Sequence, residues 1–360
     1  MQTADIVDFT MDSTAISDAF GRPVETTRIR IKPEHSLALS LKEGATGATY
    51  WAQILWPHKR DKATTIRRET AGQIHECEMP GELLLIGGQA LTDPALDTYT
   101  RTLALDGYQI LRHNPLRRLV VGNDTTICRV SARPQVTMTQ LHSALADLPI
   151  PALVSAPHIG PANATHVSAQ QRLGSHDLSQ VRSAHGHWHA GQILAALHGH
   201  AAAAMLRQPR GIDRHLAAGT AHIGILSHLA PALAQRLAEL LPLVKREKGQ
   251  CVLTHGDASP DQFLANDAET HVWITDFERA RLAPREADLG SYLQCAPPHA
   301  AQPFLDGYEA GGGQVPDDDY LRDARARTIV EKLAEPLRNA QPTWKNDMNN
   351  ALDELEGLLR

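Results

Sequence analysis

Two short segments, residues 254–264 and 274–278, constrain this chain more than any other feature of its sequence. The first carries Asp257 and Gln262, and the second carries Asp276 within the run Ile-Thr-Asp-Phe-Glu. Each includes or follows a short apolar run that is typical of a buried β-strand. Short strands place the polar residues at their ends on adjacent loops, so the two segments are expected to form one polar site.

The spacing within the first segment is that of a phosphoryl-transfer loop. Protein kinases use H-R-D-x-x-x-x-N, in which the Asp accepts the proton of the acceptor hydroxyl and the Asn binds magnesium. Asp257 and Gln262 stand at the same separation, and an apolar strand delivers Asp276 in the manner of D-F-G. His-Gly-Asp alone could be any junction between a strand and a turn. Together the two segments predict Mg²⁺-dependent phosphoryl transfer, in which positioning and charge neutralisation do most of the catalysis.

Composition and charge narrow the class of protein. The chain has 360 residues, 42% hydrophobic and 21% charged, as in a globular protein of two domains or of one elaborated domain. Its formal net charge of −6 argues against a nucleic-acid partner, which needs a basic face. No apolar run approaches the ~18–20 residues that cross a bilayer. Met1–Phe20 has no basic residue, unlike a secretory signal, so we expect a cytoplasmic protein with no membrane partner.

The first half of the chain is rich in strand patterns. Thr27–Ile31 and Leu37–Leu41 alternate apolar and polar residues on either side of a turn, which predicts a hairpin. Further strands are expected at Ala48–Trp56, Glu82–Ile86, Tyr108–Arg112, Arg118–Val121, Thr125–Val130 and Ala164–Ala169. The strands between Tyr108 and Val130 form a predicted meander, and Thr139–Leu148 after them is a predicted short helix.

The second half is mainly helical. Apolar spacing predicts helices at Trp188–Leu206, Ile212–Val244 with a break at Pro231, Asp319–Arg338 and Ala351–Leu359. Between them one compact β island is expected, made of Val252–Thr254, Phe263–Leu264 and Val272–Thr275. A β-rich first part before a helical second part is the layout of a two-lobed kinase, so we predict an α+β fold.

On these residues the chain resembles the aminoglycoside phosphotransferase and maltokinase-like group of kinases, over about Leu105–Arg338. The likeness is most specific at His255–Leu264 and Asp276–Glu278, and shorter matches occur at Leu197-His198, Asp288–Gly290 and Phe304–Tyr308. It implies a two-lobed protein-kinase-like fold, with a β-rich N-terminal cap at 1–104, a β-rich small lobe at 105–172 and a mainly helical C-terminal lobe at 173–360. The cap is expected to extend the sheet of the small lobe.

The resemblance also implies roles for individual residues. Asp257 is the base, and Gln262 and Asp276 hold Mg²⁺. His255 and Asp288 brace the catalytic loop, Asp288 through hydrogen bonds to the backbone. Gln262 departs from the Asn of most of these kinases, and its extra methylene moves the carbonyl oxygen by roughly 1.5 Å. Maltokinases also carry Gln here, so the resemblance points to the maltokinase-like side of the family.

The small lobe fits the kinase pattern less closely. In the resemblance Arg129 takes the place of the strand lysine, although it could equally be a surface arginine of an edge strand. Gln140 takes the place of the helix glutamate. The turn at Arg117 and Arg118 has no glycine to cradle phosphates. Either these arginines hold the phosphates or the turn is a plain hairpin.

The resemblance leaves the nucleotide and the acceptor open. Gln170–Leu173 lies at the expected hinge, so Gln170 and Arg172 are expected near a nucleotide that could be ATP or GTP. Contacts with the acceptor are expected from Asp261, Glu278, Tyr308 and Glu331. Carboxylates on the C-terminal helices would suit a polycationic aminoglycoside, whereas aromatic rings would suit a sugar, and neither feature prevails.

Histidines and cysteines offer little further chemistry. His185 and His189 could share a helix face and form a metal pair, but no third ligand has suitable spacing. Histidines on a helix surface or at a helix cap are therefore expected. The four cysteines are scattered and include no C-x-x-C pair, so neither a zinc site nor a redox site is predicted.

Two functions from different classes follow from the sequence. The first is Mg²⁺-dependent transfer of the γ-phosphoryl group of ATP or GTP to a hydroxyl of a sugar, an aminoglycoside or a related natural product. The second is a nucleotide-binding pseudokinase or regulatory module without turnover, which Arg129, Gln140 and the missing glycines suggest. The oligomeric state stays open.

Overall fold

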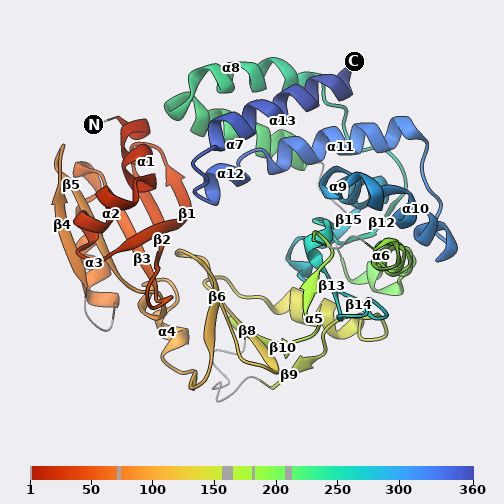
Figure 1. Ribbon diagram of the computed structural model, residues 1–360, viewed down its shortest axis with the longest axis horizontal. Helices are drawn as coiled ribbons and strands as arrows, with labels where there is room; N and C mark the ends of the chain where they lie inside the picture. The colour runs from red at the N-terminus through yellow and green to blue at the C-terminus, as the bar shows by residue number, and fades with distance from the viewer. Residues whose placement is uncertain (1, 71–73, 156–164, 181–182, 207–212) are drawn as a thin grey trace.

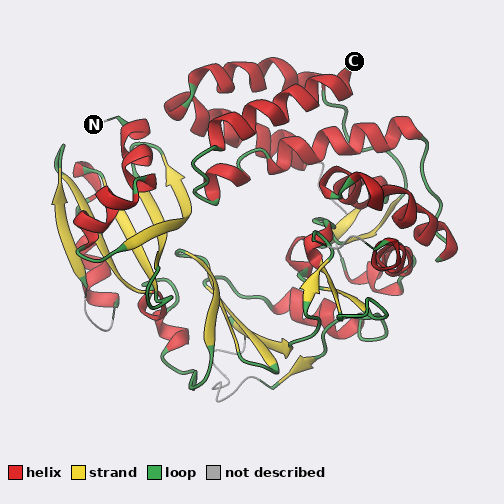
Figure 2. Cartoon of the chain, in the orientation of Figure 1, coloured by secondary structure: helices red, strands yellow, loops and turns green. Residues whose placement is uncertain are grey.

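The computed structural model describes residues 2–70, 74–155, 165–180, 183–206 and 213–360, and its parts follow one another round a ring (Figure 1). A sheet with helices comes first, a second sheet follows, and mainly helical segments complete the ring and return to the first sheet (Figure 2). None of the helices in these ranges combines the length and the apolar character that a bilayer crossing requires.

The cap forms a five-stranded antiparallel sheet of its own, in the order β1-β2-β3-β5-β4. Its strands are β1 (Val24–Lys32), β2 (Ser36–Glu43), β3 (Thr49–Leu55), β4 (His75–Met79) and β5 (Leu83–Gln89). Its helices, which the sequence patterns did not predict, are α1 (Thr3–Met11), α2 (Ser13–Phe20), η1 (Pro57–Lys59) and α3 (Asp61–Glu69). The predicted first hairpin is confirmed as β1 and β2.

The second sheet has the order β6-β7-β8-β10-β9, and the predicted meander is confirmed as its first three strands. Its elements are η2 (Ala90–Thr92), α4 (Asp97–Thr100), β6 (Gln109–Asn114), β7 (Arg118–Gly122), β8 (Thr126–Ser131), α5 (Val136–Ala144), β9 (Leu153–Val154) and β10 (Val167–Gln171). The predicted strand Ala164–Ala169 corresponds to β10, and its first residue lies outside the described residues. The predicted helix Thr139–Leu148 corresponds to α5, which starts and ends earlier.

One expectation about the cap is wrong. Within the described ranges, no strand of the cap sheet pairs with a strand of the second sheet, so the cap does not extend the sheet of the small lobe. The two sheets are instead joined by a buried carboxylate, Asp93. Its Oδ2 lies 3.0 Å from Nε2 of His113 on β6 and accepts a hydrogen bond from the backbone N–H of Leu116. The other ring nitrogen of His113 lies 3.1 Å from Oγ of Ser40 on β2.

The remaining chain is mainly helical. It contains β11 (His176–Asp177), α6 (Ala184–His198), η4 (Ala201–Met205), α7 (Arg214–Leu229), α8 (Pro231–Leu240), η5 (Leu241–Leu243), β12 (Cys251–Thr254), η6 (Pro260–Gln262), β13 (Phe263–Ala265), β14 (Val272–Ile274), η7 (Phe277–Arg279), β15 (Arg281–Pro284), α9 (Glu286–Cys295), η8 (Pro298–Ala300), α10 (Ala301–Ala310), α11 (Asp318–Lys332), α12 (Glu335–Arg338) and α13 (Trp344–Leu359). The predicted break at Pro231 is confirmed, because a proline is accepted at the start of α8 but not inside a helix.

Several predicted boundaries in this part are wrong. The predicted helix Trp188–Leu206 ends at His198 and is followed by the separate η4. The predicted helix Asp319–Arg338 is broken after Lys332, and Pro336 stands in the first turn of α12. The predicted β island is two small sheets, β11-β13-β14 and β12-β15. Helix α9 was not predicted, whereas α10 contains Phe304–Tyr308, for which the resemblance implies a helix.

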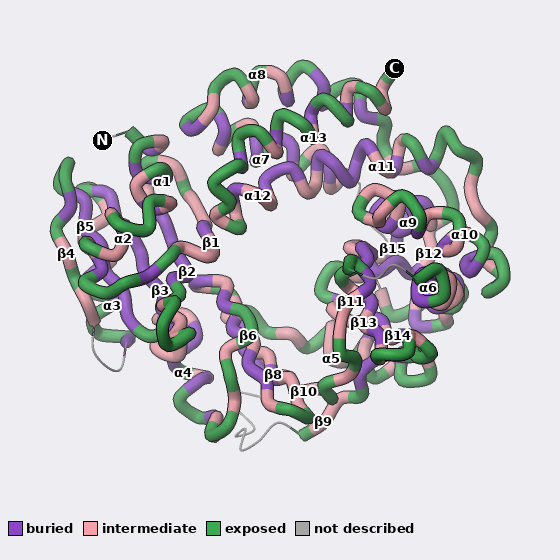
Figure 3. The backbone as a smooth tube through the Cα atoms, in the orientation of Figure 1, coloured by how far each residue is buried: buried purple, intermediate pink, exposed green. Residues whose placement is uncertain are grey.

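A shared hydrophobic core closes the ring. It includes Ile6 and Leu39 of the cap together with Leu226, Ile329 and Trp344 of the C-terminal helices. Helix α1 contacts α7, and β1 contacts α12, so the first and last thirds of the chain are packed together. Buried positions accordingly run along both sides of this junction (Figure 3).

Helices α6 and α10 approach each other closely enough for their backbones to touch. The contact depends on Gly307, where an added Cβ would lie 1.9 Å from the carbonyl oxygen of Trp188. We expect Gly307→Ala to lower the free energy of unfolding by about 3 kcal/mol or more, because backbone on both sides resists displacement. Urea denaturation measures the change. Gly224→Ala on α7 is the control, since an added Cβ there meets nothing within 4 Å and Ala favours helix. Equal stability of the two variants would contradict the close crossing.

His222 on α7 makes stability depend on pH. Its side chain is 1% exposed, and burial, together with nearby Arg338, lowers its pKa to about 4. The unfolded chain, with an ordinary histidine pKa near 6.5, therefore binds more protons between these two values. Stability should be complete above pH 6.5 and fall by roughly 3 kcal/mol as the pH drops to 4. His222→Leu should remove most of this slope in denaturation measured from pH 7 to pH 4, and an unchanged slope would contradict it.

Candidate active site

Asp288, in the first turn of α9, binds the backbone of the loop that follows β12. This carboxylate is 0% exposed. Its Oδ2 accepts from the backbone N–H of His255 at 2.6 Å, and its Oδ1 accepts from that of Gly256 at 2.8 Å. These are the contacts that the resemblance implies. Burial alone would raise the pKa of Asp288, but His198, whose Nε2 lies 3.2 Å away, lowers the pKa below its usual value.

The two segments singled out in the sequence lie side by side. Nε2 of His255 lies 2.7 Å from the carbonyl oxygen of Thr275, and the N–H of Thr275 donates to the carbonyl oxygen of Gln262 at 3.0 Å. Gly256 has a φ of 77°, and an added Cβ would lie 2.1 Å from the carbonyl oxygen of Arg279. The loop therefore needs glycine here, both for its left-handed backbone and for its close approach to the neighbouring segment.

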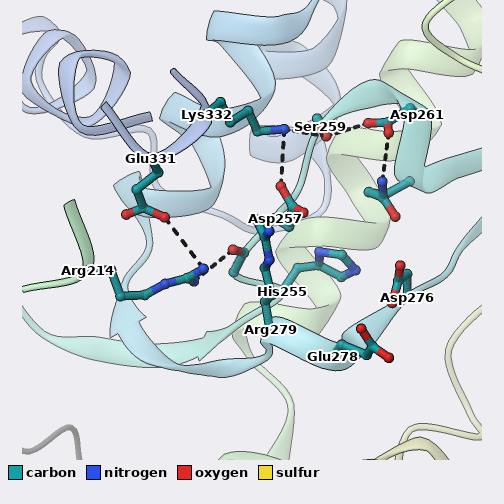
Figure 4. A network of polar contacts seen from close by, with 12 residues as sticks. Arg214, His255, Asp257, Ser259, Asp261, Asp276, Glu278, Arg279, Glu331 and Lys332 are labelled. Carbon is teal, nitrogen blue, oxygen red and sulfur yellow. Dashed lines mark hydrogen bonds and ion pairs between the residues drawn. The ribbon is translucent and has the colours of Figure 1, made fainter. Parts of the chain in front are cut away.

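Asp257 lies between two cations (Figure 4). Its Oδ1 is 3.1 Å from Nζ of Lys332, and its Oδ2 is 3.0 Å from Nη1 of Arg279. Lys332 also donates to Oγ of Ser259 at 3.0 Å. Burial would lower the pKa of Lys332, but nearby acidic groups, Asp257 among them, raise it overall, so the ammonium stays charged. The two cations fix the orientation of the carboxylate.

Asp276 stands at the end of β14 with a left-handed backbone, φ 64°. Its Oδ1 accepts from Nη2 of Arg129 at 3.1 Å, and its Oδ2 lies 3.9 Å from Nη1 of Arg118. The same two arginines also bind Glu278. Burial would raise the pKa of Asp276, but the two guanidinium groups outweigh burial and lower it. Asp276 is therefore ionised, as a metal ligand must be.

The oxygen atoms near Asp276 suit Mg²⁺. The amide nitrogen of Gln262 donates to Oδ2 of Asp261 at 2.8 Å, so its carbonyl oxygen is left for a metal. Mg²⁺ in proteins commonly takes one or two protein ligands and completes its shell with water and phosphate. The carboxylate of Asp276 and the amide of Gln262 fit that pattern. In the described ranges no group of three or more His, Cys, Asp or Glu residues could hold a metal ion.

A cleft beside Asp276 lies between the second sheet, α5 and η7. Its lining combines apolar side chains with polar ones, among them Ile127, Met138, Leu153, Thr139, Gln170 and Arg129. Gln170 also donates to Oγ1 of Thr275 at 3.4 Å, so this side chain links the second sheet to the segment that carries Asp276. Polar and charged side chains outnumber apolar ones in this lining.

Comparison with known proteins gives the family. The sequence profile of the phosphotransferase enzyme family matches residues 131–326, which is more than half of the chain. The chain belongs to the phosphotransferase enzyme family. No curated protein matches the sequence.

One solved structure supports the kinase-like fold of this phosphotransferase, and others are similar to the chain at lower TM-scores. A choline/ethanolamine kinase family protein from Mesorhizobium loti is 15% identical, with a TM-score of 0.51 over 70% of this chain and 88% of that chain. A spectinomycin phosphotransferase is 13% identical, with a TM-score of 0.47 over 70% and 92%. A macrolide 2′-phosphotransferase from Brachybacterium faecium is 22% identical, with a TM-score of 0.45 over 74% and 97%. The predicted α+β, protein-kinase-like fold is confirmed.

Two predicted nucleotide contacts of the phosphotransferase, Arg172 and Arg117, are exposed, and the predicted partner of Arg129, Gln140, does not pair with it. Arg172 is exposed, and its Nη1 donates to the carbonyl oxygen of Asn123 at 2.9 Å, in the turn between β7 and β8. Arg117 is exposed in the turn before β7, next to Arg118. Gln140 is exposed on α5 and does not pair with Arg129, whose partners are the carboxylates of Asp276 and Glu278.

The four residues expected to contact the acceptor lie in different surroundings. Tyr308 is 0% exposed and its hydroxyl lies 2.7 Å from Nδ1 of His198, so the expectation that it contacts the acceptor is wrong. Glu278 forms ion pairs with Arg118 and Arg129 of the second sheet. Asp261 and Glu331 do flank Asp257, on opposite sides (Figure 4). Burial raises the pKa of Glu331, and its Oε2 lies 3.5 Å from Nη2 of Arg214.

The clustered histidines have structural partners. Nε2 of His185 lies 3.1 Å from Nε2 of His189 on the same helix face, as the spacing predicts. His200 caps η4 by accepting from the N–H of Ala202 at 3.0 Å. His187 and His198 differ from the expected surface or cap histidines because both are buried. Nδ1 of His187 lies 2.7 Å from the hydroxyl of Tyr292, and His198 links Asp288 to Tyr308.

Sequence patterns missed four residues that surround the catalytic loop. They are His198, Arg214, Arg279 and Lys332. His198 has a sequence signal in the family resemblance, which matches a helix ending in Leu-His. Lys332 has none, since it ends a helix about seventy residues after the loop that it contacts.

Proposed function

We propose that this phosphotransferase moves the γ-phosphoryl group of ATP or GTP, with Mg²⁺, to a hydroxyl group of a sugar, an aminoglycoside or a related natural product. The observation that carries the proposal is the meeting of Asp257, Gln262 and Asp276 on two loops joined by hydrogen bonds. With Gln at 262, we propose a place on the maltokinase-like side of the family. We keep 1–104, 105–172 and 173–360 as the proposed domains.

Each residue of the site has its own proposed role in phosphoryl transfer. Asp257 orients the acceptor hydroxyl and receives its proton, while Lys332 and Arg279 hold the carboxylate in place. Gln262 and Asp276 would hold Mg²⁺, which supplies positive charge to the phosphate oxygens when bound. Asp288 and His255 keep the two loops in register through the backbone contacts described above.

The nucleotide would occupy the cleft between the second sheet and η7, with Gln170 at its inner end. Arg118 and Arg129 supply two cations beside Asp276. An arginine can bind phosphate oxygens through its planar fork, so we propose that these residues replace the glycine-rich loop and strand lysine of other kinases.

A second candidate function is a nucleotide-binding pseudokinase. It is favoured by Arg129 and Arg118 themselves, because their ion pairs with Asp276 and Glu278 compete with a metal for the same oxygens. In this case the protein would bind nucleotide with little dependence on Mg²⁺ and would not transfer phosphate.

One experiment separates the two functions. ATP and GTP are titrated into the protein by calorimetry with and without Mg²⁺, and ADP or GDP release is then followed with disaccharides, aminoglycosides and nucleoside antibiotics as acceptors. Mg²⁺-dependent binding with acceptor-stimulated release supports the phosphotransferase. Binding without Mg²⁺ dependence and without release supports the pseudokinase, and the absence of any nucleotide binding would remove both.

A further inference from the structure

Several arginines of the cap, the β6–β7 hairpin and α12 form no ion pair in the described part of the chain. We call four of them the arginine rim: Arg28 on β1, Arg112 on β6, Arg117 in the turn before β7, and Arg338 at the end of α12. On β1, Arg28 alternates with Ile29, which is 4% exposed in the cap core. Because side chains alternate along a strand, Arg28 faces away from that core.

The rim joins two parts of the chain that are distant in sequence. Nη1 of Arg28 donates to Oδ1 of Asn339 at 2.7 Å, and strand β1 contacts helix α12. Asn339 follows Arg338 directly, so Arg28 of the cap binds the residue next to Arg338 of the C-terminal lobe. Burial, then the neighbouring Arg112 and Arg118, lower the pKa of Arg28 to about 10. A half-buried cation among like charges is unfavourable unless an anion joins it.

Arg338 of the rim lies on the helix that follows a lysine in contact with the catalytic loop. Lys332, whose Nζ lies 3.1 Å from Oδ1 of Asp257, ends α11, and α12 follows it with Arg338 at its end. After burial, the charges that act on Arg338 include Glu335, Arg279 and Arg117, and its pKa is lowered overall. The rim therefore runs along α12, between the helix that carries Lys332 and strand β1 of the cap.

The carboxylates near the site do not neutralise the rim. Asp257 is held by Lys332 and Arg279, and Glu331 lies beside Arg214. Asp276 and Glu278 are paired with Arg118 and Arg129, and Asp261 binds Ser259 and Gln262. Glu335 is the remaining carboxylate, and it faces both Arg28 and Arg338 without an ion pair to either in the described residues. The rim thus keeps a surplus of positive charge.

We propose that the acceptor of this phosphotransferase is anionic, and that the arginine rim binds its phosphate or carboxylate group while its hydroxyl lies at Asp257. The inference rests on the proposed function and narrows its acceptor class. Guanidinium groups bind both kinds of anion through paired hydrogen bonds. The ammonium groups of an aminoglycoside would be repelled by the rim. The phosphates of the nucleotide have their own cations, Arg118 and Arg129, beside Asp276.

Binding of two small anions tests the rim without knowledge of the acceptor scaffold. The full chain is saturated with Mg²⁺ and a non-hydrolysable ATP analogue, so that the nucleotide site is filled. Inorganic phosphate and acetate are then titrated by calorimetry at constant ionic strength, which separates the phosphate source from the carboxylate source. We expect saturable binding of one of them, weakened at least tenfold in the double variant Arg28→Ala/Arg338→Ala.

The control is the double variant Arg60→Ala/Arg322→Ala, which removes the same charge from exposed pairs outside the site. It should bind the anion as the wild type does. Equal loss in both double variants, or no saturable anion binding by the wild type, would overturn the anionic acceptor. Binding of the ATP analogue, measured beforehand with and without Mg²⁺, reports separately on the proposed function. Its loss with anion binding intact would remove the phosphotransferase proposal and leave the rim as an anion site.

Discussion

Asp257→Asn is expected to lower turnover by about 10²–10⁴-fold while nucleotide binding stays close to that of the wild type. The asparagine keeps the shape of the side chain, and its amide oxygen can still face Lys332, which lies 3.1 Å from Oδ1 of Asp257. It cannot receive the proton of the acceptor hydroxyl. The change therefore removes a step of the reaction and leaves the cleft beside Asp276 untouched.

Single-turnover measurement of phosphoryl transfer, with calorimetry of nucleotide binding, checks this expectation. Asp306→Asn is the matched control, because Asp306 is exposed on α10 and accepts a hydrogen bond from Gln302 one helical turn away. Turnover of Asp257→Asn close to that of this control would show that another group receives the proton.

Asp276→Asn is expected to abolish Mg²⁺-dependent nucleotide binding and to lower turnover by about 10³-fold or more, because the metal contributes several kcal/mol of charge stabilisation. The variant loses the charged metal ligand. It also removes the charge from one partner of Arg129, whose Nη2 lies 3.1 Å from Oδ1 of Asp276, while the ion pair of Arg129 with Glu278 remains. Unlike Asp257→Asn, it should fail in the binding measurement as well as in turnover.

Glu278→Gln is the matched control for the metal ligand. It removes the same single charge from the same two arginines, Arg118 and Arg129, but we do not assign it to the metal. We expect it to retain Mg²⁺-dependent binding. If both variants lose that dependence equally, Glu278 is a metal ligand too. If both keep it, the assignment of Asp276 fails.

Sequence patterns predicted most about this protein where a feature depends on residues that are close together in the chain. Asp257 and Gln262 sit on one loop at a spacing that the backbone of that loop preserves, and Asp276 follows its own short strand. Pro231 ends a helix because it has no N–H to donate. The meander from β6 to β8 follows alternation and turn residues that are all nearby in the chain. Each of these features depends on neighbours a few residues away.

The failures come from contacts between distant residues. Asp319–Arg338 looks helical throughout, but the chain turns after Lys332, and this turn allows Lys332 to face Asp257 and Arg338 to face the cap. Tyr308 was expected to contact the acceptor, but its side chain is buried and its hydroxyl lies within hydrogen-bond distance of His198. The strands of the cap pair with one another and form a separate sheet. The alternation of apolar and polar residues predicts a strand but does not predict which strand it pairs with.

The sequence by itself determined the kinase-like order of strands before helices, and it predicted a base and two oxygen ligands for a metal. Only the tertiary structure decided which charged side chains surround the predicted site residues. Lys332 and Arg279 reach Asp257, and Arg28 reaches Asn339 across 311 residues of chain. The physical reason is that a motif is held by backbone geometry within a few residues, whereas an ion pair or a charged rim depends on where the packing of distant helices and sheets leaves each side chain.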